Sequence, residues 1–382
     1  MTVSLGQGTR CGFIREAIVQ DTTWPADVPA VVTHGLPLLS ATLSDGASKQ
    51  FIESRAAPYG YEAATLVSTT PDAQPVFALQ YEGFEQLFCD ALGHMSKRIG
   101  ATVLPEVIAS GVYRHLYEID NDLSTARLWT AAADGIEAGD AIPSTQRQVR
   151  RGTLAFARTV SVWEYRSAMI DQLSIRAEPS GVTCAVNFGS HSLSRTSVVN
   201  TAATMAAILP AYAPDVEFWH MECLLGPYSA STPLDSDDAL GATAWSTTVQ
   251  NRLTATFGRR TGLAREEPTR PGVPLISGSV TLGRYAADML LDAWPANTIW
   301  MMRTRFTGPL IDGVNPFRLT IYIPSLRITQ AQAPLNTGAA NLPLLWFAEA
   351  PAAQPAGFPT LSRLTPIAIE VQNSIAEHPL LT

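Results

Sequence analysis

The sequence predicts a mainly β chain of two tandem β-sandwich or barrel domains, each with one short helix packed against its strands. Three observations predict this class: alternating apolar patterns, a content of 27 Pro and 26 Gly, and segments that recur in the same order. Frequent turn residues favour short strands joined by turns. At 382 residues the chain exceeds the size that one hydrophobic core usually serves, which favours two domains.

A strand followed by a helix is predicted over residues 75–93, PVFALQYEGFEQLFCDALG. Phe77, Leu79 and Tyr81 alternate with smaller or polar residues, which is the period of a half-buried strand. After Gly83, apolar residues follow at helical spacing to the end of the stretch. The stretch therefore supplies one strand and one helix that packs against the sheet.

The same pattern recurs at residues 276–294, ISGSVTLGRYAADMLLDAW, where Gly278 lies 201 residues after Phe77. Three further segments recur in the same order, so an internal duplication is predicted. The paired segments are 36–51 with 243–258, 77–93 with 276–294, 153–161 with 298–306, and 170–181 with 323–334. We expect one domain over residues 1–205 and another over residues 206–382, called here the first half and the second half.

The first half carries a segment that the second half lacks, residues 94–150, in which hydrophobic periodicity is poor. We expect a long, partly ordered loop there, because irregular segments of this length inside a domain are usually functional. An irregular N-terminal arm precedes a strand at residues 36–44, and an Ala-rich connector is expected at residues 201–214. A strand at residues 153–165 leads to a hairpin with its turn at AEPSG, residues 177–181.

The charge of the chain argues against a protein that grips nucleic acid. The net charge is −8, and the longest basic cluster consists of Arg147, Arg150 and Arg151. A protein that binds phosphate groups needs a basic face, so tight or sequence-specific DNA binding is not expected, whereas passage of DNA is compatible. Charged residues make up 16% of the chain, below the roughly 25% of an average soluble domain, which suits a surface covered in an assembly.

Cysteine usage and hydropathy indicate a chain that is made and kept in a cytoplasm. The four cysteines are far apart in the sequence, and buried free thiols are expected rather than disulfides at Cys11, Cys89, Cys184 and Cys223. The first residues lack the basic-then-apolar layout of a signal peptide, and no apolar run reaches 18 residues. Export by a visible signal and membrane insertion are therefore not expected.

Three motifs suggest chemistry, but each departs from the pattern that the chemistry needs. GQGTRCG, residues 6–12, has the wrong glycine spacing for a dinucleotide-binding loop and no preceding strand. HMEC, residues 220–223, supplies at most part of a metal site, and a strand with Met221 and Cys223 on one face is expected. Residues 235–241, DSDDALG, lack the glycine and closing glutamate of a calcium loop. We therefore expect no catalytic, cofactor-binding or metal-binding residues and no enzyme activity.

The order of these elements resembles that of the tail tube proteins of long-tailed bacteriophages. The first-half motifs that carry the resemblance are GQGTRCGF in the arm, LPLLSATL at residues 36–43, Tyr81-Glu82-Gly83 before the helix, and Leu92-Gly93 at its end. The later motifs are YRSAMIDQLSIRAEPSG at residues 165–181, VQNRLTATFG at 249–258 and VPLISGSVTL at 273–282. The resemblance covers most of residues 1–200 and 240–335.

The resemblance implies a structural subunit without catalytic site or cofactor. Rings of such subunits stack into a hollow conduit through which genome DNA leaves the capsid. It further implies other tail proteins (tape measure, terminator and baseplate) as partners, and location in the virion tail after assembly in the host cytoplasm. Six copies of the domain usually surround the channel, so two domains per chain imply rings of three chains. An acidic lining is expected, because a basic lining would bind each phosphate and stall the DNA.

Two segments outside the repeated unit, the N-terminal arm and residues 94–150, are expected to contact the next ring. The candidate contact residues are Glu118, Asp120, Asp122 and Arg127. An outer decoration exposed to solvent is the alternative for residues 94–150.

Two other functions stay open at this point. Another tail component, such as a terminator or hub protein, would share the fold class. A carbohydrate-binding β-sandwich would instead display aromatic side chains around a groove, and the candidates are Trp129, Trp163, Trp219 and Trp300.

Overall fold

The structure is a computed structural model of the 382-residue chain, and it confirms the mainly β class. All strand pairs are antiparallel among the described residues, and nineteen of the strands join one continuous pairing network. The structure describes residues 2–3, 11–15, 31–53, 61–96, 98–99, 102–103, 105–119, 126–127, 141–142, 151–158, 160–208, 213–254, 274–283, 289–331, 342–359 and 364–376.

The elements of the first half begin with seven strands and a helix. These are β1 (Thr2–Val3), β2 (Cys11–Arg15), β3 (His34–Leu36), β4 (Leu38–Ser44), β5 (Ala47–Glu53), β6 (Tyr61–Thr69), β7 (Asp72–Ala78) and α1 (Glu85–Leu92). Seven short or medium strands follow: β8 (Gly93–Ser96), β9 (Arg98–Ile99), β10 (Thr102–Val103), β11 (Glu106–Ala109), β12 (Val112–Ile119), β13 (Ala126–Arg127) and β14 (Ala141–Ile142). The last elements are β15 (Arg151–Ala157), β16 (Val162–Glu178), β17 (Gly181–Gly189), β18 (Ser192–Ser194) and α2 (Ala202–Ala207).

The second half contains fewer elements. A 3-10 turn, η1 (Phe218–His220), leads into β19 (Met221–Pro227), and a second turn, η2 (Ser236–Asp238), precedes the main strands. These are β20 (Ala242–Gln250), β21 (Leu275–Leu282), α3 (Met289–Ala296), β22 (Ile299–Leu310), β23 (Pro316–Ala331), β24 (Leu342–Ala348) and β25 (Ala368–Asn373).

The two halves pair their strands in the same order. In the first half the order is β4-β7-β17-β16-β15-β2, and in the second half it is β20-β21-β24-β23-β22-β19. A helix follows the second strand of each series, α1 after β7 and α3 after β21. The recurring segments of the sequence therefore occupy corresponding places in the pairing order.

Side-chain volume is exchanged between corresponding positions of the two halves. Phe77 on β7 lies opposite Cys184 on β17, whereas Gly278 on β21 lies opposite Trp346 on β24. A large residue therefore faces a small one in both halves, but on opposite strands. Interiors are packed at nearly constant density, so a gain of volume at one position requires a loss at its neighbour.

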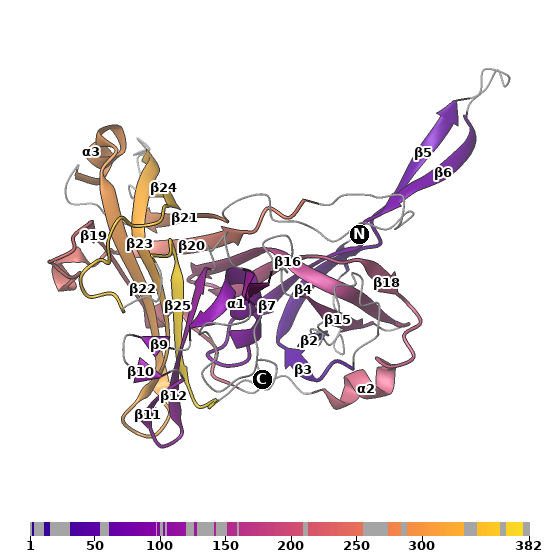
Figure 1. The fold of residues 1–382 in the computed structure, drawn as a ribbon, viewed down its shortest axis with the longest axis horizontal. Coiled ribbons are helices and arrows are strands. Elements are labelled where there is room, and N and C mark those ends of the chain that lie inside the picture. Colours follow the sequence, from indigo (N-terminus) through magenta and orange to yellow (C-terminus); the bar gives the residue numbers. More distant parts are fainter. Residues whose placement is uncertain are drawn as a thin grey trace.

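The halves share one hydrophobic core. A single cluster of buried residues includes Phe77 and Leu173 from the first half and Trp245 and Phe306 from the second. Figure 1 shows most of the first half at the right and the second half at the left, with β11 and β12 of the first half beside β25 at the left and α1 between the two sides. All eight residues of α1 are buried, as a helix covered on every side requires.

Residues 94–150 contain a strand that the sequence analysis did not predict. β12 pairs with β8 on one edge and with β25 of the second half on the other. Residues 115–119 are all buried, because both faces of this strand are covered. A strand buried on both faces shows no apolar–polar alternation, which is why the periodicity is poor there. The prediction of a partly ordered loop is therefore wrong for residues 105–119, and residues 120–125, 128–140 and 143–150 lie outside the described part.

Two other segments that were predicted to be irregular contain regular structure. β2 lies inside the expected N-terminal arm, where it pairs with β15 and β3, and Cys11 and Gly12 are buried. The connector at residues 201–214 contains the short helix α2, whose first turn is capped by the Thr201 side chain. Neither segment has the amphipathic period that would predict a strand or helix, because each is stabilised by contacts with residues far away in the sequence.

Two other expectations, the buried free cysteines and the hairpin that turns within residues 177–181, are confirmed. Cys11, Cys89, Cys184 and Cys223 are all buried free thiols. The hairpin of β16 and β17 turns at residues 179–180, and the β5–β6 hairpin projects away from the body of the molecule (Figure 1). Within the described ranges, no helix has the length and hydropathy needed to cross a membrane.

We expect Gly278→Ala to lower the free energy of unfolding by about 1–3 kcal/mol, the usual range for overpacking. A Cβ atom at this position would overlap the carbonyl oxygen of Ser246 and the ring of Trp346. Gly241→Ala is the matched control, since a Cβ there meets no atom within 4 Å. Urea unfolding of both variants measures the difference; equal stability would contradict the volume exchange.

Candidate functional site

The motifs considered for chemistry do not assemble into a reactive site in the described part of the chain. His220 lies in η1 rather than in a strand, and β19 begins at Met221, with Cys223 buried on it. Residues 235–241 form an exposed turn in which Asp235 caps η2. Across the described ranges, no group of three or more His, Cys, Asp or Glu residues is arranged to bind a metal ion. The main structural feature of the described part is instead the strand pairing that joins the two halves, called here the seam.

The seam is an antiparallel pairing of β16 with β20. Six residue pairs join the strands, from Gln172 opposite Gln250 to Ala177 opposite Trp245. On the core face, Trp245, Thr247 and Val249 are each about 1% exposed. Because backbone N–H and C=O groups of both strands are satisfied across the seam, the sheet continues from one half into the other.

The opposite face of the seam carries a row of small polar contacts. The hydroxyls of Ser174 and Thr248 lie 2.9 Å apart, and Gln250 Nε2 donates to Gln172 Oε1 at 3.2 Å. These residues face each other directly in the strand register, so each contact adds to the backbone pairing at the same point. The seam is therefore apolar on one face and hydrogen-bonded on the other.

Asn251, the residue after β20, connects the seam to α1. Its backbone N–H donates to the carbonyl of Asp171 at 2.7 Å, and its Nδ2 donates to the carbonyls of Ile170 and Ala91 at 2.9 and 3.1 Å. Ala91 is in the last turn of α1, where carbonyls have no partner within the helix. Asn251 is fully buried. Its hydrogen bonds satisfy backbone carbonyls at the end of α1 and at the irregularity of β16 near Asp171.

The Tyr81-Glu82-Gly83 motif before α1 contacts the second half. The Tyr81 ring stacks on Phe317 with 5.8 Å between centroids, and its hydroxyl lies 3.1 Å from His220 Nδ1. That nitrogen accepts from the Glu217 backbone N–H at 3.3 Å, so the Tyr81 hydroxyl donates to it. Glu82 accepts the backbone N–H of Ser374 at 2.9 Å. The Tyr81-Glu82-Gly83 motif is therefore part of the junction between the halves.

Glu85 at the start of α1 fixes the end of β25. Its carboxylate accepts the Gly83 backbone N–H at 2.7 Å and the side-chain amide of Asn373. Burial raises the pKa of Glu85 to about 7, against the hydrogen bonds that favour the charged form. A carboxyl group with a pKa of about 7 therefore lies at the contact between α1 and the C-terminal strand.

Two histidines complete this junction. His34 donates from Nε2 to the carbonyl of Gly83 at 2.7 Å, and His115 donates to the carbonyl of Ile375 at 2.8 Å. Burial lowers the pKa of His34, so its neutral form is favoured. Both rings donate to backbone carbonyls.

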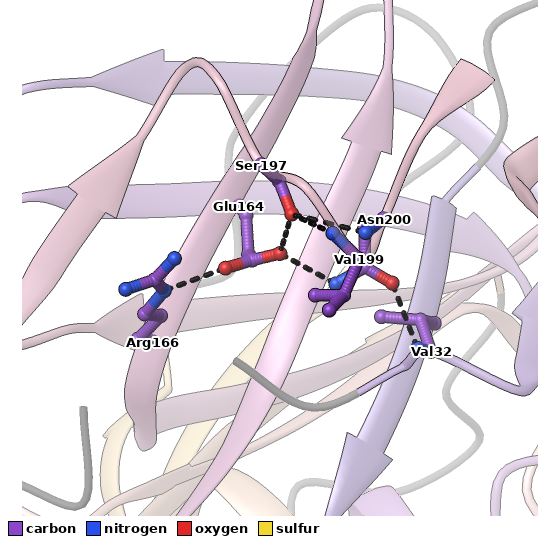
Figure 2. Close-up of polar contacts among 6 residues, drawn as sticks. All are labelled: Val32, Glu164, Arg166, Ser197, Val199 and Asn200. Atoms are coloured by element: carbon purple, nitrogen blue, oxygen red, sulfur yellow. Dashed lines mark hydrogen bonds and ion pairs between the residues drawn. The ribbon is translucent and has the colours of Figure 1, made fainter. Parts of the chain in front are cut away.

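A second polar cluster surrounds Glu164 on β16 (Figure 2). Glu164 is fully buried and accepts from Arg166 Nε at 2.6 Å, from Asn200 Nδ2 at 2.6 Å and from the Ser197 hydroxyl. Asn200 Oδ1 in turn accepts the Val32 backbone N–H at 2.9 Å. The carboxylate is surrounded by hydrogen-bond donors. These contacts hold the segment after β18 and the segment before β3 against β16, so we assign Glu164 a structural role.

The outer face of the second-half sheet carries alternating charges. Arg303 and Arg305 approach Glu222 at 3.4 and 4.0 Å. Burial raises the pKa of Glu370, and the neighbouring Arg114 and Arg318 oppose that shift. Basic groups on this face therefore lie beside carboxylates, which reduces their attraction for phosphate.

Of the four residues predicted to contact a neighbouring ring, only Glu118 and Arg127 lie in the described part. Glu118 is fully buried in β12, opposite His94 and Ala368. Arg127 lies in β13, and Asp120 and Asp122 lie outside the described residues. Sequence reasoning missed Asn251 and the seam, because a lone Asn after a strand carries no signal of the distant carbonyls that it meets.

No protein-family model matches the chain, and no curated protein matches its sequence.

We expect the pKa shift of Glu85 to make stability fall as pH rises from 4.5 to 7. Glu85→Gln should remove that contribution and leave the part due to Glu370, whose pKa burial also raises. The pKa of Glu85 is raised from 4.5 to about 7, so the folded state keeps a proton that the unfolded state releases. The contribution of Glu85 to the free energy of unfolding is then fully present below pH 4.5 and lost above pH 7, a difference on the order of 3 kcal/mol. Urea unfolding between pH 4.5 and 8 measures this slope.

Glu178→Gln is the matched control for the titration of Glu85. Glu178 pairs with the exposed Arg176 at the end of β16, so its replacement should leave the pH dependence in place. If Glu85→Gln and the unaltered chain showed the same slope, the buried carboxyl would not be the source.

Proposed function

We propose that this protein is the structural subunit of a bacteriophage tail tube, in which stacked rings form a hollow conduit for genome ejection. One observation carries the proposal: two halves with the same strand order are joined edge to edge through β16 and β20. A fold that joins like units by strand pairing is suited to build a ring, since pairing around a circle leaves no open sheet edge.

The count of units favours three chains in each ring. Two repeated units per chain give six units in a ring of three, the number that the resemblance implies. Half of the junctions are then within chains, so fewer subunits lose translational freedom on assembly. Each half also diverges independently, and only the first half carries the insertion that supplies β12.

The charge distribution supports a conduit that DNA passes without binding. The net charge is −8, and the arginines on the outer face of the second half lie beside Glu222 and Glu370. We propose an acidic majority along the lining, which repels phosphate and limits residence of the DNA. The partners would be other copies and other tail proteins, and the location would be the virion tail.

A terminator or hub protein of the same tail is the second candidate within this class, because a ring of strand-paired units serves those roles as well. A carbohydrate-binding protein is less well supported. Trp300 is 2% exposed, and the Trp163 ring is covered by the guanidinium groups of Arg158 and Arg195 at 4.4 and 4.6 Å. Trp219 is 74% exposed, and Trp129 lies outside the described residues.

We expect the purified chain to form rings that stack into tubes, with three chains in each ring. Negative-stain images show whether rings and tubes form, and native mass spectrometry of the smallest closed species counts its chains. A monodisperse monomer at high concentration would contradict the proposal. Six chains per ring would retain the tube but contradict the equivalence of the two halves, and rings that never stack would favour a terminator.

A further inference from the structure

Four arginines lie on the outer face of the second-half sheet, toward the end where β22 turns into β23. Arg303 and Arg305 are on β22, Arg318 is on β23, and Arg114 is on β12, the strand that the first half adds to this sheet (Figure 1). Gln372 of β25 lies directly between Arg114 and Arg318 in the strand register, so these side chains share one face. We call the four residues the arginine cluster.

The described carboxylates of this face do not balance the arginine cluster. Glu106 pairs with Arg114, and Glu222 is shared by the two arginines of β22 at 3.4 and 4.0 Å. The third carboxyl group, Glu370, is 6% exposed, and burial raises its pKa, which favours its neutral form. Four positive charges therefore face at most three negative charges of the described residues. An excess this small suits a single carboxylate better than the phosphate chain of a nucleic acid.

Arg318 is the member of the cluster that needs a partner. Among the described residues, no carboxylate forms an ion pair with it. Its pKa is lowered, first by burial and then by repulsion from Arg305, whereas a close carboxylate would raise that pKa. Within the described part, the Nε atoms of all four arginines are also buried without a hydrogen-bond acceptor. A further carboxylate would therefore be stabilised here by charge-assisted hydrogen bonds.

The same outer face carries acidic residues toward its other end. Residues 235–238, called here the acidic turn, contain three aspartates. The turn lies against β19, since a Cβ atom at Gly226 would be 2.7 Å from Asp238 Oδ1. Gly226 is on the same face of β19 as Glu222, the partner of the arginines, because side chains alternate along a strand. Four residues, about 13 Å of strand, separate these two positions.

Two aspartates fix the shape of the acidic turn, and the third extends from it. Asp235 accepts the Asp237 backbone N–H at 2.8 Å, and Asp238 accepts the Asp235 backbone N–H at 3.0 Å. The side chain of Asp237 is exposed, and no group of the described residues forms a hydrogen bond or ion pair with its carboxylate. Because the backbone of the turn is already held, binding through Asp237 costs little conformational entropy.

We propose that the arginine cluster of one chain binds the acidic turn of a second copy, with Asp237 beside Arg318. The charges are complementary: four arginines and three glutamates give the cluster a charge of +1, whereas the whole chain carries −8. The two surfaces lie toward opposite ends of one sheet face, so copies shifted along the strands bring them together, and the contact is head-to-tail. It rests on the proposed function, because it names a contact between stacked rings.

Carbodiimide cross-linking of assembled tubes tests this contact. The reagent joins an amine to a touching carboxylate without a spacer, and the chain contains two lysines, Lys49 and Lys97. Arg318→Lys places a third lysine amine in the cluster and keeps its charge. Light and heavy isotope-labelled chains of this variant are mixed before assembly, so that a cross-link between copies joins one peptide of each kind. We expect residues 318 and 237 to be joined in this way, roughly tenfold above the control described next.

Arg176→Lys is the matched control, because Arg176 is exposed on the first half and its partner is Glu178 of the same strand. Asp237→Asn, at an exposed position of the turn, should abolish the cross-link in the Arg318→Lys chain. By itself it should raise the concentration needed for tube growth about fivefold, as expected for one partly exposed charge pair. Tubes without the cross-link between copies, or Asp237→Asn tubes that grow at the unaltered concentration, would overturn this contact but leave the tube. Chains that never assemble would overturn the proposed function and this contact together.

Discussion

The backbone pairing of β16 with β20 is the constraint on which the rest of the structure depends. It brings the second half against the first so that Leu173, Trp245 and Val249 enter one core. Once the strands are paired, Asn251 reaches the end of α1, and the helix is covered on all sides. A buried helix of only eight residues gains little stability by itself, so its order derives from this packing.

The insertion in the first half strengthens the same junction. β12 lies between β8 and β25, so a strand of the first half extends the sheet of the second. Glu85 and Glu82 then bind Asn373 and Ser374 at the end of β25. Among the described residues, strand pairing thus joins the halves both through the repeated strands and through an element that only the first half has.

The sequence predicted the elements that are governed by local pattern. Residues 75–93 and 276–294 alternate and then turn helical, and the structure has a strand and a helix in each. β12 and the seam were not predicted, for two physical reasons. β12 is buried on both faces and shows no alternation. The seam joins residues 68 to 78 positions apart, partly through small polar side chains such as Ser174 and Thr248. The need for glycine at position 278 follows only from the structure, where the Trp346 ring occupies the space that a Cβ atom would fill.

Hydrogen exchange of the intact chain, followed by mass spectrometry in increasing urea, tests the shared core most directly. If β16 and β20 join the halves into one cooperative unit, peptides covering residues 172–177 and 245–250 lose protection together, at the same urea concentration as those covering β7 and β23. The account predicts one coincident transition for all four peptides. A second half that opens at lower urea while the β16 and β7 peptides stay protected would contradict it.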